Sequence, residues 1–202
     1  MFSRSDDNSI RPESDLTSFS DSILLDRISR GDIASFDALF YRHYDRLYGL
    51  LFRLVGTRAE AEDLAQEVFL KLYTRVERGL PVAMDENISG WLYRVAMNLG
   101  YNALRDRKRM DKRNIHLVPE NDTSVEGEVN SRTERMIVRT TLARLPERQA
   151  LLLLLRQMNF SYAECAVICD VAPGSVGTLL ARAAEAFRRE YSILAGHKGG
   201  VE

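Results

Sequence analysis

The sequence predicts an all-α protein of two helical domains, an N-terminal helical bundle and a C-terminal helix-turn-helix, joined by a flexible linker. Nearly every long segment carries apolar residues at three- and four-residue spacing, which is typical of amphipathic helices. That period is lost between residues 111 and 131, where Pro, Gly, Asn, Ser, Thr and acidic residues gather. We therefore divide the chain into a disordered tail (1–20), a first domain (21–110), an acidic linker (111–131) and a second domain (132–202).

Composition narrows the class of protein. The 202 residues are 45% hydrophobic and 28% charged, as in a globular protein of one or two domains. No run of about 18 apolar residues predicts a membrane span, and the Ser- and Asp-rich first 20 residues lack the apolar core of a signal peptide. The two cysteines offer no disulfide framework, which favours a reducing compartment. We expect a cytoplasmic protein without membrane insertion.

Four helices are predicted in the first domain. The apolar spacing indicates a short helix near residues 23–31, a second over 33–55 and a third over 58–77. Each is followed by a glycine, the residue that most readily ends a helix: Gly31, Gly56 and Gly79. A loop over residues 79–87 then leads into the fourth helix.

The fourth helix has two faces, and the second is the most informative feature of the chain. One face is an apolar stripe, and the other recurs at the same spacing with cations, amides and an aromatic ring: Arg94, Asn98, Tyr101, Asn102 and Arg105. Such side chains hold phosphates while stacking on or hydrogen-bonding unpaired bases. Six of the nine residues from 105 to 113 are cations. For the run alone, a solvated helix end is the default interpretation, but together with the polar face the run indicates a protein that handles melted DNA.

Helical spacing resumes at residue 132 and predicts helices over 132–145 and 147–158. Ser161 and Glu164 then form a capping-box pattern at the start of the next helix, and Asp170 follows at a turn that favours left-handed geometry. Pro173 opens a last helix that reaches about residue 191. Two helices joined by a tight turn in this way are typical of a helix-turn-helix.

Cys165 and Cys169 lie four residues apart on the predicted helix that Ser161 caps. A buried cysteine behaves as a small hydrophobe, which favours a core role for both. A zinc or redox site is the alternative, but it needs further ligands that the neighbouring sequence does not supply.

Four stretches together are similar to the bacterial sigma-70 family, extracytoplasmic-function (ECF) type. They are FDALFYRHY (36–44), AEDLAQEVFLKL (61–72), WLYRVAMN (91–98) and LPERQ with FSYAE (145–149 and 160–164). The resemblance covers roughly residues 21–191 in the expected order. It implies a factor that binds core RNA polymerase and directs it to promoters. The first domain of such factors contacts the clamp coiled coil and melts the −10 element, and the second binds the −35 element and the flap.

By this resemblance, polymerase contacts fall on the third helix, at Asp63, Gln66, Glu67, Phe69 and Leu70. The loop over residues 80–87 corresponds to a segment that captures a flipped base, although a loop that only caps the next helix is a competing interpretation. Trp91 is either a core residue or lies at the edge of the melted bubble. The predicted −10 contacts are Asp85, Glu86, Asn87, Trp91, Arg94, Asn98, Tyr101, Arg105, Arg107, Lys108, Arg109, Lys112 and Arg113.

The last helix departs from the family pattern. Similar proteins commonly have a cation where Gly177 stands and Arg where Leu179 stands. Each lost phosphate contact weakens binding in a salt-dependent way, so we expect weak −35 binding, mostly through Ser175, Thr178 and Arg182. The predicted −35 contacts are Pro173, Gly174, Ser175, Gly177, Thr178, Leu179 and Arg182.

We predict an alternative sigma factor that acts by binding, with no cofactor, metal or catalytic role. The three histidines are scattered, and no Ser-His-Asp, phosphate-loop or metal-ligand pattern is present in the sequence. The resemblance also implies an anti-sigma factor as a partner. The alternatives are a sigma-like DNA-binding regulator without a productive holoenzyme, and a protein-binding adaptor. The linker acids either occupy a channel later taken by RNA or form a solvated tether: Glu120, Asp122, Glu126 and Glu128.

Overall fold

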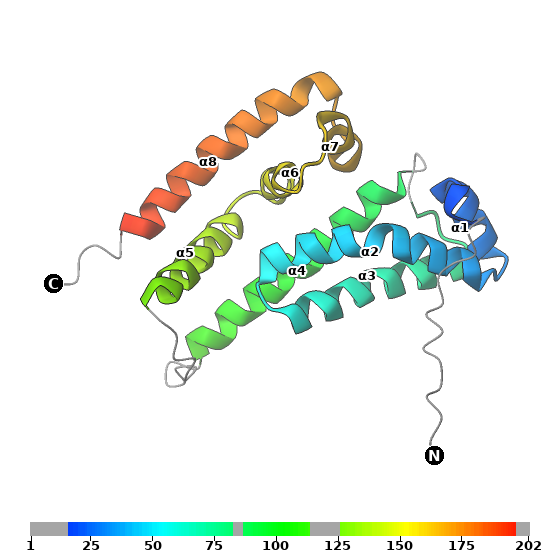
Figure 1. Ribbon diagram of the computed structural model, residues 1–202, viewed down its shortest axis with the longest axis horizontal. Coiled ribbons are helices and arrows are strands. Elements are labelled where there is room, and N and C mark those ends of the chain that lie inside the picture. The colour runs from blue at the N-terminus through cyan, green and yellow to red at the C-terminus, as the bar shows by residue number, and fades with distance from the viewer. Residues whose placement is uncertain (1–15, 83–86, 114–125, 197–202) are drawn as a thin grey trace, which may run out of the picture.

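The computed structural model describes residues 16–82, 87–113 and 126–196, and the side chains of residues 17, 108–113 and 126–132 are not described. Within these ranges every regular element is a helix, which confirms the predicted all-α class (Figure 1). The N-terminal unit contains η1 (Leu16–Ser18), α1 (Asp21–Ser29), α2 (Ile33–Val55), α3 (Arg58–Glu77) and α4 (Ile88–Arg113). The C-terminal unit contains α5 (Glu126–Leu142), α6 (Glu147–Gln157), α7 (Tyr162–Cys169), η2 (Pro173–Ser175) and α8 (Val176–Gly196).

Helices α2, α3 and α4 form the core of the N-terminal unit. Helix α2 is capped by Asp32, whose side chain accepts from the Ser35 amide at 3.3 Å, and it ends at Gly56 with φ +92°. Gly100 lies where α4 crosses α2, because a Cβ there would approach Leu54 Cδ2 to 2.5 Å. The close approach of the two helices therefore depends on this glycine.

The C-terminal unit confirms the predicted capping and turn. Ser161 accepts from the Glu164 amide at 3.2 Å, and the Glu164 carboxylate accepts from the Ser161 amide at 2.7 Å. Asp170 ends α7 in the left-handed region at φ 53°. The capping box therefore begins α7, and Asp170 ends it at the turn that leads to α8, the second helix of the predicted helix-turn-helix.

Three boundaries differ from the sequence prediction. Helix α5 begins at Glu126, inside the segment expected to be linker, and α8 ends at Gly196, beyond residue 191. The disordered tail was expected to extend to residue 20, but η1 already packs against α2, and Leu16 is only 5% exposed. An apolar side chain that finds a core site orders the residues around it. Residues 1–15 and 114–125 lie outside the described ranges.

The two units share one core. The buried residues of α2 and α4 belong to the same contiguous cluster as those of α6 and α7, and Figure 1 shows α6 and α7 beside α4. No single helix in the described ranges is long and apolar enough to cross a membrane. Helix α7 and residues 173–196 reach the length and apolar composition of a membrane span only when they are taken together, and a bend of 107° separates them.

Candidate nucleic-acid interface

Arg94 and Asn98 lie one turn apart on α4, and both side chains are exposed. They line one side of a pocket of about 310 Å³ between the two units. The other side is formed by residues of α6 and α7, namely Glu147, Arg148, Leu151 and Cys169. A guanidinium and an amide therefore face a space that is lined by charged and apolar groups of the C-terminal unit.

Tyr101 does not lie on the exposed face as predicted. It is 5% exposed, and its hydroxyl donates to the Leu142 carbonyl at 2.9 Å. Burial raises the pKa of its phenol. Its helical spacing put Tyr101 with Arg94 and Asn98, but the C-terminal unit covers this part of α4, so the ring and hydroxyl serve the contact between the units.

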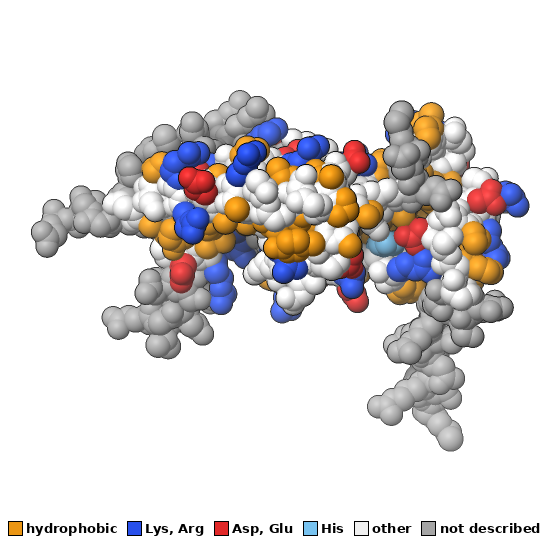
Figure 2. All heavy atoms as spheres, turned by 90° about the horizontal axis from the view of Figure 1, so that it is seen from above, with side chains coloured by type: hydrophobic (Ala, Val, Ile, Leu, Met, Phe, Trp, Pro, Cys, Tyr) orange, Lys and Arg blue, Asp and Glu red, His pale blue; other side chains and the backbone are white. Residues whose placement is uncertain are grey.

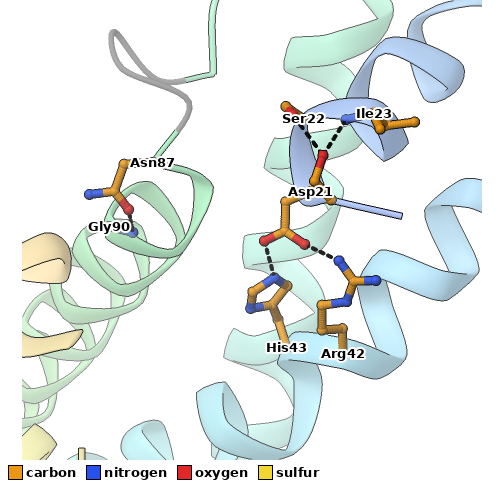
Figure 3. A network of polar contacts seen from close by, with 8 residues as sticks. Asp21, Ser22, Ile23, Arg42, His43, Asn87 and Gly90 are labelled. Carbon is orange, nitrogen blue, oxygen red and sulfur yellow. Dashed lines mark hydrogen bonds and ion pairs between the residues drawn. The ribbon is translucent and has the colours of Figure 1, made fainter. Parts of the chain in front are cut away.

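Asn87 holds the start of α4. Its Oδ1 accepts from the Gly90 amide at 2.7 Å (Figure 3), and its Nδ2 donates to the Val167 carbonyl on α7. The loop end therefore caps the helix, as one of the two interpretations expected, and also contacts the C-terminal unit. Asp85 and Glu86 lie outside the described residues.

The basic end of α4 is partly anchored to its own unit. Arg107 pairs with Glu60 of α3 and donates to the Val55 carbonyl at 3.2 Å. Arg105 is exposed. Burial raises the pKa of the Glu147 carboxyl, and the positive charge of Arg105 offsets part of this rise. The remaining predicted cations have side chains outside the described set: Lys108, Arg109, Lys112 and Arg113.

The outer face of α3 carries most of the predicted polymerase contacts. Asp63 and Gln66 are exposed, Glu67 pairs with Lys71 at 3.1 Å, and Leu70 is 64% exposed. Phe69 does not face outward, because it is 2% exposed and its ring lies 4.6 Å from that of Phe40. The prediction that Phe69 lies on the partner-facing edge is therefore wrong.

A groove of about 620 Å³ runs from this face of α3 to the start of α4. Trp91 lines it and is partly buried against the core, as the core interpretation expected, whereas its place at the edge of a melted bubble stays a prediction. Cations and apolar side chains share the walls, which are formed by Glu67, Leu70, Lys71, Thr74, Arg75, Arg78, Leu80 and Trp91.

The turn before α8 and its first turns present most of the predicted −35 residues. Pro173, Gly174, Ser175, Thr178 and Arg182 are exposed. Leu179 is half-buried against the core, and a Cβ at Gly177 would meet only the Tyr162 ring at 3.7 Å. Figure 2, which views the molecule from above, shows hydrophobic side chains together with scattered Lys and Arg side chains on this side of the molecule.

Both cysteines are buried. Burial raises the pKa of the Cys165 thiol, and burial together with Cys165 raises the pKa of Cys169 to about 12. Among the described residues no three His, Cys, Asp or Glu side chains converge to hold a metal ion. The structure thus places both thiols in the core, the interpretation that the sequence favoured.

Sequence reasoning did not find the α6 residues that face Arg94 and Asn98. Glu147 and Arg148 lie in a segment that was predicted as a helix and noted for its resemblance, but no periodic signal connects α6 with α4. It also did not find the contact of Asp21 with Arg42 and His43, which joins α1 to α2. Both depend on tertiary packing.

Comparison with known proteins identifies similar chains. The family model described as "Sigma-70 region 2" matches residues 39–110, and "Sigma-70, region 4" matches residues 135–187. The RNA polymerase sigma-H factor of Pseudomonas aeruginosa is 31% identical over 192 residues, covering 85% of this chain and 93% of that protein. The ECF RNA polymerase sigma-E factor of Escherichia coli K12 is 29% identical over 180 residues, covering 82% and 91%.

A solved structure with a similar fold is that of CnrH in complex with the cytosolic domain of CnrY. It has a TM-score of 0.52 and 20% identity, and the match covers 88% of this chain and 97% of that one.

Proposed function

Because this chain belongs to the sigma-70 family and is an ECF-type alternative sigma factor that directs transcription initiation, we propose that α4 and the loop before it hold the melted −10 element. In the same proposal the outer face of α3 binds core RNA polymerase, and the start of α8 binds the −35 element. The domain limits proposed for these roles are residues 21–110 and 132–202.

The observation that carries the proposal is the pair Arg94 and Asn98, exposed one turn apart on α4. A guanidinium binds phosphate and an amide reads a base edge. Opening DNA costs a few kcal/mol for each base that leaves the stack, so the side chains that receive the bases have to offset that cost. The polar pair therefore has the chemistry that the proposed step requires.

The proposed polymerase contact is supported by Asp63, Gln66, Glu67 and Leu70. All four lie on the outer side of α3, where an exposed leucine stands among polar groups. Apolar side chains with a polar surround are common at protein interfaces. Phe69 is left out of this set because it is buried.

We further propose that the protein acts by binding rather than catalysis, in the cytoplasm where its polymerase works, and that an anti-sigma factor holds it inactive. The solved complex of CnrH with CnrY supports the last point by analogy. Co-purification from native cells tests it, and recovery of the protein without an inhibitor under non-inducing conditions would refute it.

Transcription with purified core polymerase tests the role of α4. The promoters are first identified by sequencing transcripts started by the reconstituted holoenzyme. The double variant Arg94→Ala with Asn98→Ala is expected to lower open-complex formation by about tenfold or more, since each base or phosphate contact contributes ~1–3 kcal/mol.

Arg30→Ala is the matched control, because this exposed arginine of α1 pairs with the exposed Asp26 on the same helix. It should leave promoter opening unchanged. Both variants should still bind core polymerase in gel filtration. Normal opening by the double variant would refute the proposed role of α4.

A further inference from the structure

We propose that the groove that runs from α3 to the start of α4 (the α3–α4 groove) binds a free nucleoside polyphosphate, and that the bound nucleotide keeps core RNA polymerase off α3. The binding site stands on the residues of the groove alone. Only the exclusion of polymerase rests on the proposed function of α3.

The α3–α4 groove has the size and the composition of a small-molecule site. Its volume of about 620 Å³ lies within the range of ligand pockets, which is about 300–1,000 Å³. Three cations, one carboxylate and one hydroxyl share its walls with three apolar side chains. The excess of positive charge favours an anion, and the apolar part favours a ligand that also carries a ring.

The three cations of the groove lie on one face of α3. Lys71, Arg75 and Arg78 recur at four- and three-residue spacing. With a rise of about 1.5 Å per residue they span about 10 Å along the helix. Positive charge concentrated over this short length suits a chain of linked phosphates, which binds Lys and Arg through charge-assisted hydrogen bonds.

Each of these cations has donors to offer a phosphate. Lys71 pairs with Glu67 at 3.1 Å, but the two side chains are 48% and 44% exposed, and such a pair is weak enough to be exchanged for a phosphate. The bond from Arg75 Nε to the Pro81 carbonyl uses one of five N–H donors and holds the guanidinium in place. Arg78 is exposed and makes no ion pair within the described residues.

Trp91 supplies a flat surface for a base. It lines the groove and is partly buried against the core, which holds the indole in place. Leu70 and Leu80, which are 64% and 46% exposed, complete the apolar part of the walls. Aromatic side chains stack on every nucleobase, and a side chain already held by packing loses little freedom when a ligand binds. The groove therefore combines a stacking surface with phosphate-binding cations.

A single DNA strand is the competing occupant, because Trp91 is also a predicted −10 contact. Two features favour a free nucleotide. The cations occupy only about two turns of α3, whereas a strand carries a phosphate at every nucleotide. The Glu67 carboxylate also stands in the groove wall, where it disfavours the continuation of a polyanion.

A nucleotide in the groove would also affect polymerase, because two wall residues are proposed polymerase contacts. Glu67 and Leu70 line the groove and belong to the outer face of α3. A bound nucleotide would lie against both side chains and add negative charge to this face. We therefore expect nucleotide and polymerase to weaken each other's binding.

Titration calorimetry of the full chain with GTP, in a buffer without divalent metal, tests the site. Arg78→Glu should weaken GTP binding by about tenfold or more, because repulsion replaces a charge-assisted contact. Arg58→Glu is the matched control, since it makes the same change at an exposed position of α3 that does not line the groove. GTP should quench the emission of Trp91, the single tryptophan, whereas inorganic triphosphate should bind more weakly and quench little.

Absence of saturation at about 1 mM GTP, where binding is already weak, would overturn the site. Equal weakening by Arg78→Glu and Arg58→Glu would overturn it too, because it would show only a general attraction of charge. A short single-stranded DNA should lose little affinity in Arg78→Glu. If it lost as much affinity as GTP, the groove would hold a strand and the free nucleotide would be refuted.

Competition is measured as binding of the protein to immobilised core polymerase. GTP at about ten times its dissociation constant should weaken binding of the parent protein by about tenfold. It should have little effect on Arg78→Glu, which also controls for nucleotide bound by the polymerase itself. Equal effects of GTP on both proteins would overturn the competition.

The polymerase face is tested separately with Asp63→Ala combined with Gln66→Ala, because neither residue lines the groove. This variant should bind polymerase more weakly and GTP with unchanged affinity. If it bound both normally, the proposed polymerase face would be refuted while the nucleotide site stood.

Discussion

Asp21 joins α1 to α2 through two side chains. Its carboxylate accepts from Arg42 at 2.5 Å and bonds to His43 Nε2 at 2.8 Å (Figure 3). Burial alone would raise the pKa of Asp21, but the hydrogen bonds and charges of His43 and Arg42 outweigh it and hold the pKa below 3.8. The ionised carboxylate is therefore the form that the folded protein favours.

Asp21→Asn should lower the free energy of unfolding by about 2 kcal/mol at pH 7, because hydrogen bonds to a charged group are lost. A depressed folded pKa contributes stability above the unfolded pKa and loses it as the pH falls through the folded pKa. The gap between the two proteins should therefore narrow below about pH 4. Urea titrations between pH 7 and pH 3 measure it.

Asp26→Asn is the control for that measurement, because Asp26 and its partner Arg30 are both exposed. It should change the urea midpoint little at any pH. A gap between Asp21→Asn and the parent protein that stays constant from pH 7 to pH 3 would contradict the role given to the ionised carboxylate.

Single residues show which features can be inferred from sequence. Gly56 and Asp170 mark helix ends because their backbones adopt left-handed geometry, a local property of the residue. Phe69 and Tyr101 were placed wrongly because burial depends on what packs against them. Phe69 meets the aromatic rings of α2, and Tyr101 meets α5, 41 residues further along the chain. Helical spacing cannot reveal either partner.

At the scale of elements, α7 depends on its cap. It has eight residues, too few for a stable isolated helix, and its capping box satisfies both the Ser161 and Glu164 amides. Ser161→Ala should lower the free energy of unfolding by about 1 kcal/mol, as measured by thermal denaturation. Ser192→Ala, whose hydroxyl bonds the Arg188 carbonyl within α8, should be nearly neutral. Equal effects of the two substitutions would refute this role of the cap.

Helix α8 carries few exposed cations where DNA is proposed to bind. Arg182 is exposed one turn after Thr178, whereas Leu179 packs inward. If Arg182 contacts one phosphate, Arg182→Ala should reduce the slope of log affinity against log salt by about one. Holoenzyme titrations on a fragment containing the −35 element, at several salt concentrations, measure this slope.

Glu185→Ala is the control on α8, because it removes an exposed acid and no phosphate contact. It should not reduce the slope. An Arg182→Ala holoenzyme with the parental slope would exclude a phosphate contact at this position.

Helix boundaries were predicted well where a cap or a glycine marks them, as at Ile33–Val55 and Arg58–Glu77. They were predicted poorly at α5, which extends N-terminally to Glu126 through residues that lack apolar spacing. Composition identified residues 126–131 as linker, because acids, Gly and Ser are typical of linkers. These residues extend a helix whose later turns pack in the C-terminal unit, and sequence alone does not reveal such an extension.

At the scale of the whole molecule, the shared core links the stability of the two units. Phe160 lies against Tyr93 and Arg46, so unfolding of either unit exposes apolar surface of the other. Trp91, the single tryptophan, lies on α4 and reports on the N-terminal unit, whereas far-ultraviolet circular dichroism reports on all helices.

In urea, the fluorescence and circular-dichroism transitions of the parent protein should therefore coincide, as for one cooperative unit. Gly49→Leu, which presses on Met158, should separate them, with part of the helical signal lost at lower urea than the Trp91 signal. Gly49→Ala should keep them together. A core that is continuous from α2 to α7 cannot lose one side without weakening the other, which is why the two transitions are expected to coincide. Separate transitions in the parent protein would show instead that the units unfold independently.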